Sequence, residues 1–113
     1  ENKCLTFVPT HEFLYAGLSL RFDFKKMLEP KNYEEVDVES EASYFLMIEG
    51  RARHSRHSEY AEASIFLKNR RGDIISETTI SRRCFTQLCA LSDYSKVFTS
   101  AYQELLKTLK PCE

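Results

Sequence analysis

The sequence lacks the patterns that mark several common functional classes. It contains 3 glycines and 3 prolines, which leaves little material for a glycine-rich phosphate-binding loop. No apolar run approaches the roughly 18–20 residues that a membrane-spanning helix needs. Lysine and arginine number 16 against 17 aspartates and glutamates, so the net charge of −1 lacks the positive excess typical of DNA-binding domains. We therefore expect no transmembrane segment and no nucleic-acid partner.

The length and composition are those of one folded domain. The chain has 113 residues, which is within the usual size of a single domain, so we expect residues 1–113 to fold as one unit. Hydrophobic residues make up 42% and charged residues 29%, close to ordinary globular usage. These values argue against a disordered tail or a fibrous protein.

Residues for nucleophilic or acid–base catalysis are poorly represented. The histidines are His11, His54 and His57, and the last two fall in a polar turn. A Gly-x-Ser-x-Gly elbow is absent. The acidic residues between Tyr33 and Glu41 resemble a solvated face rather than a catalytic pair. We expect no catalytic residue, no cofactor and no enzymatic activity.

Four cysteines without a Cys-x-x-Cys motif favour disulfides over a redox or metal site. They are Cys4, Cys84, Cys89 and Cys112. The preferred pairing is Cys84–Cys89, which closes a small loop, and Cys4–Cys112, which ties the chain ends together. Such bridges indicate an oxidising compartment. The alternative is four reduced thiols in a cytosolic protein.

A zinc site is the main metal alternative. Cys84-x4-Cys89 and His54-x2-His57 supply the ligand types of a Cys2His2 site. The histidines precede the cysteines, and their spacing is short, unlike common zinc fingers. The expectation is that no metal is bound.

Hydrophobic periodicity predicts a strand, a short helix and an edge strand in the first part of the chain. Phe13–Phe24 alternates, and Leu14, Ala16, Leu18, Leu20, Phe22 and Phe24 are expected on one face of a single strand. Lys25–Leu28 is expected to be helical and to stop at Pro30. The acidic stretch Tyr33–Glu41 is expected to be an exposed edge strand or a loop.

Three antiparallel strands and a helix are expected to follow. The strands are Ser43–His54, Tyr60–Lys68 and Asp73–Arg83, with a hairpin loop at Asn69–Gly72. If Lys68 pairs with Asp73, one face receives the helix through Ile65, Leu67, Ile74, Ser76, Thr78 and Ile80.

The helix is the clearest element of the pattern. Ser92 or Asp93 is expected to cap it, and Pro111 to end it. Its apolar stripe comprises Tyr94, Phe98, Ala101, Tyr102, Leu105 and Leu109. The whole pattern predicts an α+β two-layer sandwich: a mostly antiparallel sheet of four to five strands covered by a C-terminal helix.

Arginines form the candidate ligand-binding site. Arg51, Arg53 and Arg56 surround the turn between the first two hairpin strands, and Arg82 and Arg83 end the last strand. Consecutive hairpins would bring these five together at one sheet end, where guanidinium groups can bind phosphate or carboxylate. Alternatively, they neutralise the acidic Tyr33–Glu41 segment or keep the sheet end soluble.

Three local motifs resemble those of small envelope lipoproteins of Gram-negative bacteria. They are the apolar strand in Glu41–Gly50, the hairpin Ala61–Ile80 with its Arg71-Gly72-Asp73 turn, and the amphipathic helix Tyr94–Leu109. They look like motifs of the LptE-like lipopolysaccharide-assembly lipoproteins and of the auxiliary lipoproteins of ABC-type lipid transporters. The resemblance implies a periplasmic, outer-membrane-anchored or otherwise secreted protein. Any targeting or lipid-attachment sequence would lie upstream of Glu1. The long first helix of those families is here reduced to Lys25–Glu29, and the Cys84–Cys89 pair departs from their pattern.

The hypothesis that follows is a non-enzymatic extracytoplasmic binding or assembly domain. Its expected partner is another envelope or secreted protein, or an anionic amphipathic ligand such as a lipid head group. The alternatives are an immunity or inhibitor protein for a secreted toxin, and a dimeric cytosolic secretion chaperone with four free thiols. The oligomeric state is left open.

Overall fold

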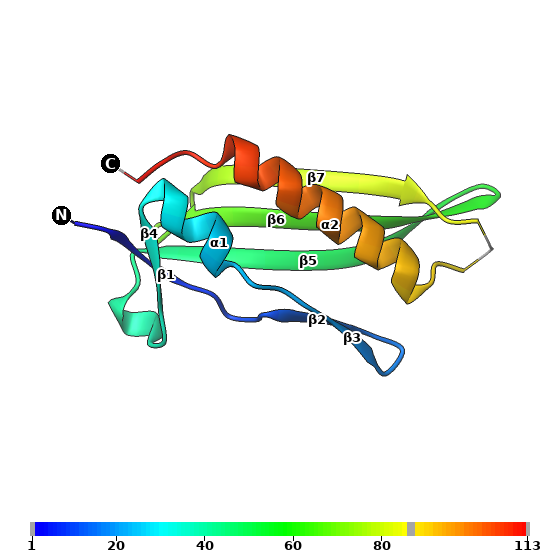
Figure 1. Ribbon diagram of the computed structural model, residues 1–113. Coiled ribbons are helices and arrows are strands. Elements are labelled where there is room, and N and C mark those ends of the chain that lie inside the picture. The colour runs from blue at the N-terminus through cyan, green and yellow to red at the C-terminus, as the bar shows by residue number, and fades with distance from the viewer. Residues whose placement is uncertain (1, 86–87, 113) are drawn as a thin grey trace.

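The computed structural model describes residues 2–85 and 88–112 as an α+β fold (Figure 1). Its main sheet has the strand order β4-β1-β5-β6-β7. β1 pairs in parallel with β4 and β5, whereas β5, β6 and β7 are antiparallel. The strands are β1 (Cys4–Phe7), β4 (Tyr33–Val36), β5 (Tyr44–Ser55), β6 (Ser58–Asn69) and β7 (Ile74–Arg83). The fold class expected from the sequence is confirmed.

The remaining elements lie outside the main sheet. They are β2 (Glu12–Tyr15), β3 (Leu18–Arg21), α1 (Lys25–Leu28), the short 3-10 turns η1 (Glu29–Lys31) and η2 (Glu39–Glu41), and α2 (Leu91–Thr108). The expected helix at Lys25–Leu28 and the acidic edge strand β4 are both present. Strand β1 was not expected, because four residues are too few to show a periodicity.

The prediction of one strand over Phe13–Phe24 is wrong. The chain folds back at Ala16 and Gly17, whose φ angles of 52° and 80° form a two-residue hairpin turn. Tyr15 pairs with Leu18 across this turn, so the inward face changes from odd to even positions. Leu14 is consequently 67% exposed rather than in the core.

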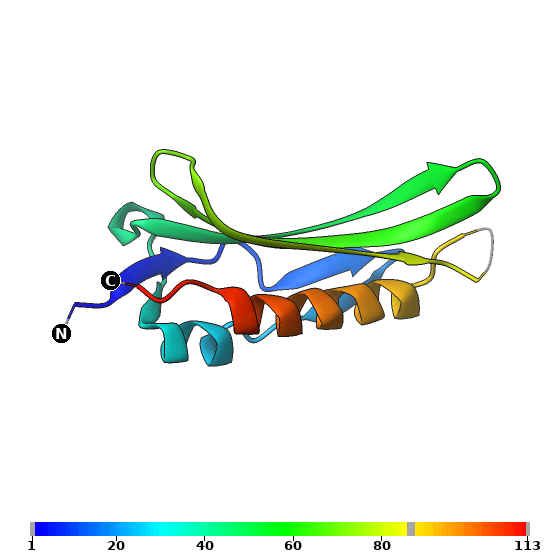
Figure 2. The same cartoon turned by 90° about the horizontal axis from the view of Figure 1, so that it is seen from above.

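All the covering elements lie on one face of the main sheet. Figure 2 shows α1, α2 and the β2–β3 hairpin on one side, and no described element over the other face of β5, β6 and β7. The sheet bends away from α2 at both ends, which makes the uncovered face concave. We call this uncovered surface the open face.

Helix α2 packs on the covered face as expected. Its inward residues are buried, and they include Tyr94, Phe98, Ala101, Leu105 and Leu109. The predicted cap, Ser92 or Asp93, is wrong by two or three residues. Ala90 is the N-cap residue, and Asp93 lies inside the first turn, where its carboxylate accepts the Ala90 N–H at 2.8 Å. The negative charge of Asp93 also interacts favourably with the positive end of the helix dipole.

The pairing of Lys68 with Asp73 is also corrected. Lys68 pairs with Ile74, and a register shift follows Leu67. This shift moves Ile74 off the covered face and leaves it 51% exposed. Thr78, rather than Ser76, lies opposite Ile65, and it stays on the covered face as expected.

The two expected disulfides are present. Cys4 and Cys112 join the chain ends with a Cα–Cα distance of 5.9 Å, and Cys84 and Cys89 are 5.3 Å apart. No cysteine is free. Disulfides are compatible with an oxidising, extracytoplasmic compartment.

Among the described residues, no helix has the length and apolar character that a membrane span requires.

Candidate functional site: the arginine end of the sheet

The structure places the five candidate arginines at one end of the sheet. Tyr60 pairs with Arg53 on one side and with Arg83 on the other. Arg56 lies in the β5–β6 turn beside them. We call this region the arginine end. Arg70 and Arg71 lie at the opposite end, in the β6–β7 loop.

The five arginines do not converge into one cluster, because a sheet has two faces. Alternation places Arg51, Arg53 and Arg83 on the open face. Arg82 pairs with the fully buried Ala61 and therefore faces the helix side. The expectation of a single convergence is corrected accordingly.

Glu62 organises the open-face arginines. It lies opposite Arg51 in the β5–β6 register, and its side chain is 5% exposed. Its carboxylate accepts hydrogen bonds from Arg51 Nε, from Arg53 Nη1 at 3.2 Å and from Ser81 Oγ at 3.1 Å. The side chains of Arg51 and Arg53 are 54% and 64% exposed, and Arg51 Nη1 also lies 3.6 Å from Glu49 Oε2. One buried carboxylate thus holds two exposed guanidinium groups in fixed positions.

Opposing effects act on the pKa of Glu62. Burial raises this pKa, and the hydrogen bonds from Arg53, Arg51 and Ser81 together lower it by more. The net shift of the pKa is downward, so Glu62 is an anion across the physiological range.

The acidic segment expected to neutralise the arginines lies elsewhere. Strand β4 pairs with β1 at the other end of β5, far from the β5–β6 turn. Glu35 on β4 instead contacts His11 at 2.7 Å. Glu62, and not the Tyr33–Glu41 segment, is the acidic partner of Arg51 and Arg53. Glu62 could have been found from the sequence only by aligning β6 with β5, so that Glu62 lies opposite Arg51. That alignment requires the exact strand register.

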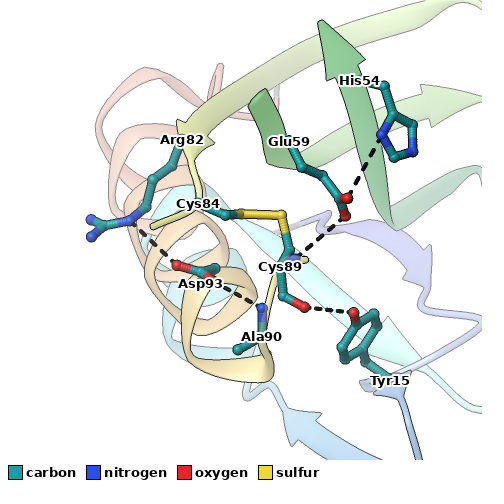
Figure 3. Close-up of a disulfide and its surroundings, with 8 residues drawn as sticks. All are labelled: Tyr15, His54, Glu59, Arg82, Cys84, Cys89, Ala90 and Asp93. Atoms are coloured by element: carbon teal, nitrogen blue, oxygen red, sulfur yellow. Dashed lines mark hydrogen bonds and ion pairs between the residues drawn. A yellow bond between two sulfur atoms is a disulfide. The ribbon is translucent and has the colours of Figure 1, made fainter. Parts of the chain in front are cut away.

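Arg82 belongs to a separate polar cluster around the Cys84–Cys89 disulfide (Figure 3). Its Nε lies 3.8 Å from Asp93 Oδ1, too long for a hydrogen bond, and this buried nitrogen has no hydrogen-bond partner among the described residues. The Asp93 carboxylate accepts the Ala90 N–H at the start of α2. Arg82 therefore supports the helix–sheet junction.

Glu59 and Tyr15 complete this cluster. The Glu59 carboxylate accepts the Cys89 N–H at 3.4 Å and lies 3.7 Å from His54 Nδ1. The Tyr15 hydroxyl donates to the Cys89 carbonyl at 2.6 Å, which ties the β2–β3 hairpin to the disulfide. Burial, with Tyr15, Glu59 and Asp93 close by, raises the pKa of Tyr94.

The cysteines and histidines do not assemble the zinc site considered above. Cys84, Cys89 and Asp93 offer ligand atoms within 4.8 Å of one another. However, the two sulfur atoms are joined in a disulfide and are not available as thiolate ligands. His54 is directed at Glu59 instead (Figure 3).

Of the five candidate arginines, two have no acidic partner among residues 2–85 and 88–112. Arg56 lies at the β5–β6 turn with a φ of 43°, and Arg83 ends β7 on the open face. Both are exposed. Within this group of five, their charges are the least compensated by the fold.

An apolar area adjoins the arginines on the same face. Phe45 and Met47 on β5 lie on the open face, and Met47 pairs with Phe66 on β6. Lys68 Nζ lies 5.4 Å from the centre of the Phe66 ring. Between the apolar area and the arginines, Ser64 Oγ and Thr79 Oγ1 are hydrogen-bonded at 2.8 Å. Arg70 Cζ lies 5.7 Å from the centre of the Phe45 ring, and Phe66 is buried. The open face thus has an arginine end and an aromatic area over which Lys68 and Arg70 lie.

A cleft of about 580 Å³ lies on the other side of the molecule, between β4 and the segment before α1. Lys3, His11 and Lys25 line it together with Asp23, Glu29, Glu34 and Glu35. Because both signs of charge are mixed there, the cleft favours no single class of ligand.

The comparisons with known proteins assign no family. No family model matches the chain, and no curated protein matches it. A crystal structure of protein XCC0632 from Xanthomonas campestris, of family DUF330, is similar at 10% sequence identity and a TM-score of 0.33. The match covers 96% of this chain and 82% of that one. We base no assignment on a likeness at this TM-score.

Proposed function

We propose that the protein is a non-enzymatic, extracytoplasmic binding domain whose open face recognises an anionic amphipathic ligand. The observation that carries this proposal is the arrangement around Glu62. Two exposed arginines are held by one buried carboxylate on a surface that no described element covers. Fixing a guanidinium before binding lowers the entropy lost when it meets a phosphate or carboxylate.

The layout of the open face supports an amphipathic ligand over a simple anion. The acidic head group would meet Arg51 and Arg53, and an apolar chain would extend along β5 toward the half-buried Met47. The concave curvature of the sheet gives such a chain a surface to follow (Figure 2). The two disulfides support a periplasmic or secreted location. They argue against the alternative of a cytosolic secretion chaperone, which would have four free thiols.

The proposal is tested by binding of two lipids that differ in head-group charge. The probes are lauroyl lysophosphatidylglycerol, which is anionic, and lauroyl lysophosphatidylcholine, which is zwitterionic, both below their critical micelle concentrations. Isothermal titration should show tighter binding of the anionic lipid, with affinity falling as salt is added because exposed charges are screened. Equal affinity for both lipids, or binding of neither, would contradict the proposal.

A pair of matched variants locates the site. Arg51→Gln/Arg53→Gln should weaken binding of the anionic lipid by about tenfold or more, because each lost charge-assisted contact contributes about 1.5–3 kcal/mol. Lys96→Gln/Lys107→Gln removes the same charge from exposed positions of α2, on the opposite side of the sheet. This control should bind as the wild type does. A similar loss in both variants would show that net charge alone governs binding.

A further inference from the structure

The free edge of the main sheet carries an inference that does not depend on the ligand. The sheet ends at β4 on one side and at β7 on the other. An edge strand presents unpaired backbone groups, and natural proteins usually protect such edges with short strands or like charges. β4 is protected in both ways, because it has four residues and carries Glu34 and Glu35. β7 has ten residues and is rich in isoleucine and threonine.

Two contacts define which part of β7 is free. At its start, the Lys110 N–H lies 3.4 Å from Ser76 Oγ, so the chain after α2 occupies that end. At its other end, Cys84 enters the disulfide. The accessible edge therefore runs from Glu77 to Arg83, a stretch centred on Ile80.

The hydrogen-bond pattern shows which backbone groups face outward. The Cys84 N–H donates to the Glu59 carbonyl at 2.8 Å, so this pair bonds toward β6. In an antiparallel ladder, such pairs alternate along the strand. Arg82, Ile80 and Thr78 therefore also bond toward β6. The outward-facing N–H and C=O groups belong to Glu77, Thr79, Ser81 and Arg83.

We propose that two copies of the chain pair antiparallel along β7, with Ile80 opposite Ile80 of the second copy. In this register Thr79 lies opposite Ser81 and Glu77 lies opposite Arg83. Every outward-facing backbone group between Glu77 and Arg83 then gains a partner. The result is a two-fold symmetric dimer with one continuous sheet, the closed arrangement that most homo-oligomers adopt.

Charge complementarity favours a second copy of the chain at the β7 edge, and it favours the register with Ile80 opposite Ile80. Glu77 and Arg83 both project from the open face, and both are exposed. In the proposed register each Glu77 meets an Arg83 of the second copy, so the dimer contains two opposite-charge pairs between the strands. Sliding one strand by two residues in either direction, to the next hydrogen-bonded register, moves Glu77 away from Arg83 of the second copy. Opposite charges across a strand pair stabilise it, and like charges destabilise it.

The test is a charge exchange followed by sedimentation velocity over a concentration series. The wild type should approach twice the 13.2 kDa mass of one chain as its concentration rises. Glu77→Arg alone and Arg83→Glu alone place like charges opposite each other, so each should dissociate with a Kd raised about tenfold or more. Mixing the two variants restores both opposite-charge pairs and should return a heterodimer at the wild-type Kd.

A control and a contradicting result complete the design. Glu104→Arg makes the same charge change on an exposed position of α2 and should leave the dimer unaffected. Restoration by mixing excludes misfolding as the cause of dissociation in the single variants. A wild type that stays monomeric at every concentration would overturn the proposal. So would a mixture that fails to restore the dimer.

Discussion

Glu62 is the residue whose protonation most directly affects the open face. Its pKa is lower in the folded protein than its ordinary value of 4.5. A group of this kind contributes stability above its unfolded pKa and loses that contribution as the pH falls through its folded pKa. The charge network at the arginine end should therefore weaken in acid.

We predict that Glu62→Gln lowers the free energy of unfolding by about 1–3 kcal/mol at neutral pH, because Arg51 and Arg53 lose an ionised acceptor. The difference from the wild type should shrink at about pH 3, which lies below the ordinary pKa of 4.5, because the unfolded wild type binds a proton there more readily than the folded protein does. Urea denaturation at both pH values measures this. A difference that stays constant between them would contradict the assigned role of Glu62.

At the scale of elements, the β2–β3 hairpin depends on one glycine in β5. A Cβ atom built on Gly50 would lie 2.5 Å from Cε1 of Phe13. Phe13 is itself packed against Tyr94 and Phe98 of α2, with ring centres 5.0 and 4.9 Å away. The ring has little freedom to move, so the absence of a side chain at Gly50 lets the hairpin approach the sheet.

We predict that Gly50→Ala destabilises the protein by about 1–3 kcal/mol through overpacking. In a Phe13→Leu background the same change should cost less, because the smaller side chain leaves room for the new methyl group. Chemical denaturation of the four proteins forms a double-mutant cycle that isolates this contact. Additive effects would mean that Gly50 and Phe13 are not in contact.

Helix α2 offers a matched pair of neighbouring leucines. Leu105 is fully buried and Leu106 is 39% exposed. Leu105→Ala should lower the free energy of unfolding by about 2–5 kcal/mol as a core truncation. Leu106→Ala should change it by about 0.5 kcal/mol or less. Equal effects on the melting temperature would show that α2 does not dock on the sheet as described.

The long elements of the fold were predictable from the sequence, whereas the short hairpin and the partner of the arginines were not. Helix α2 was predictable because its periodicity persists over more than ten residues, and β6 and β7 because alternating residues flank the Asn69–Gly72 turn. β5 was predictable from the continuous apolar run between Tyr44 and Ile48. The β2–β3 hairpin was missed because a two-residue turn at Ala16 and Gly17 interrupts no alternation, although it reverses which positions face inward. The order of the hairpins was enough to predict that the arginines lie at one end of the sheet. Predicting Glu62 as their partner would have required the β5–β6 register, which composition alone does not define.

At the scale of the whole molecule, the Cys4–Cys112 bridge closes nearly the entire chain. The two cysteines are separated by 108 residues, whereas Cys84 and Cys89 are separated by 5. In the chain-entropy account, a bridge constrains the unfolded state more when its loop is longer. The terminal bridge should therefore contribute more to stability than the small one.

We predict that Cys4→Ser/Cys112→Ser lowers the free energy of unfolding by about 4–5 kcal/mol, against about 2 kcal/mol for Cys84→Ser/Cys89→Ser. Guanidinium denaturation without reductant compares the two variants. A larger loss from the small loop would mean that contacts around Cys89, such as the Tyr15 hydrogen bond, outweigh the entropic effect.

The central claim is that the open face is the recognition surface. The most direct measurement is amide chemical-shift mapping by NMR during titration with lauroyl lysophosphatidylglycerol, with lauroyl lysophosphatidylcholine as the reference. The account predicts that the anionic lipid shifts amides of β5, β6 and β7 from Met47 to Arg53, around Glu62 and near Arg83, and leaves the exposed side of α2 unchanged. Shifts confined to α2 or to the cleft beside His11, with the open face unaffected, would contradict it.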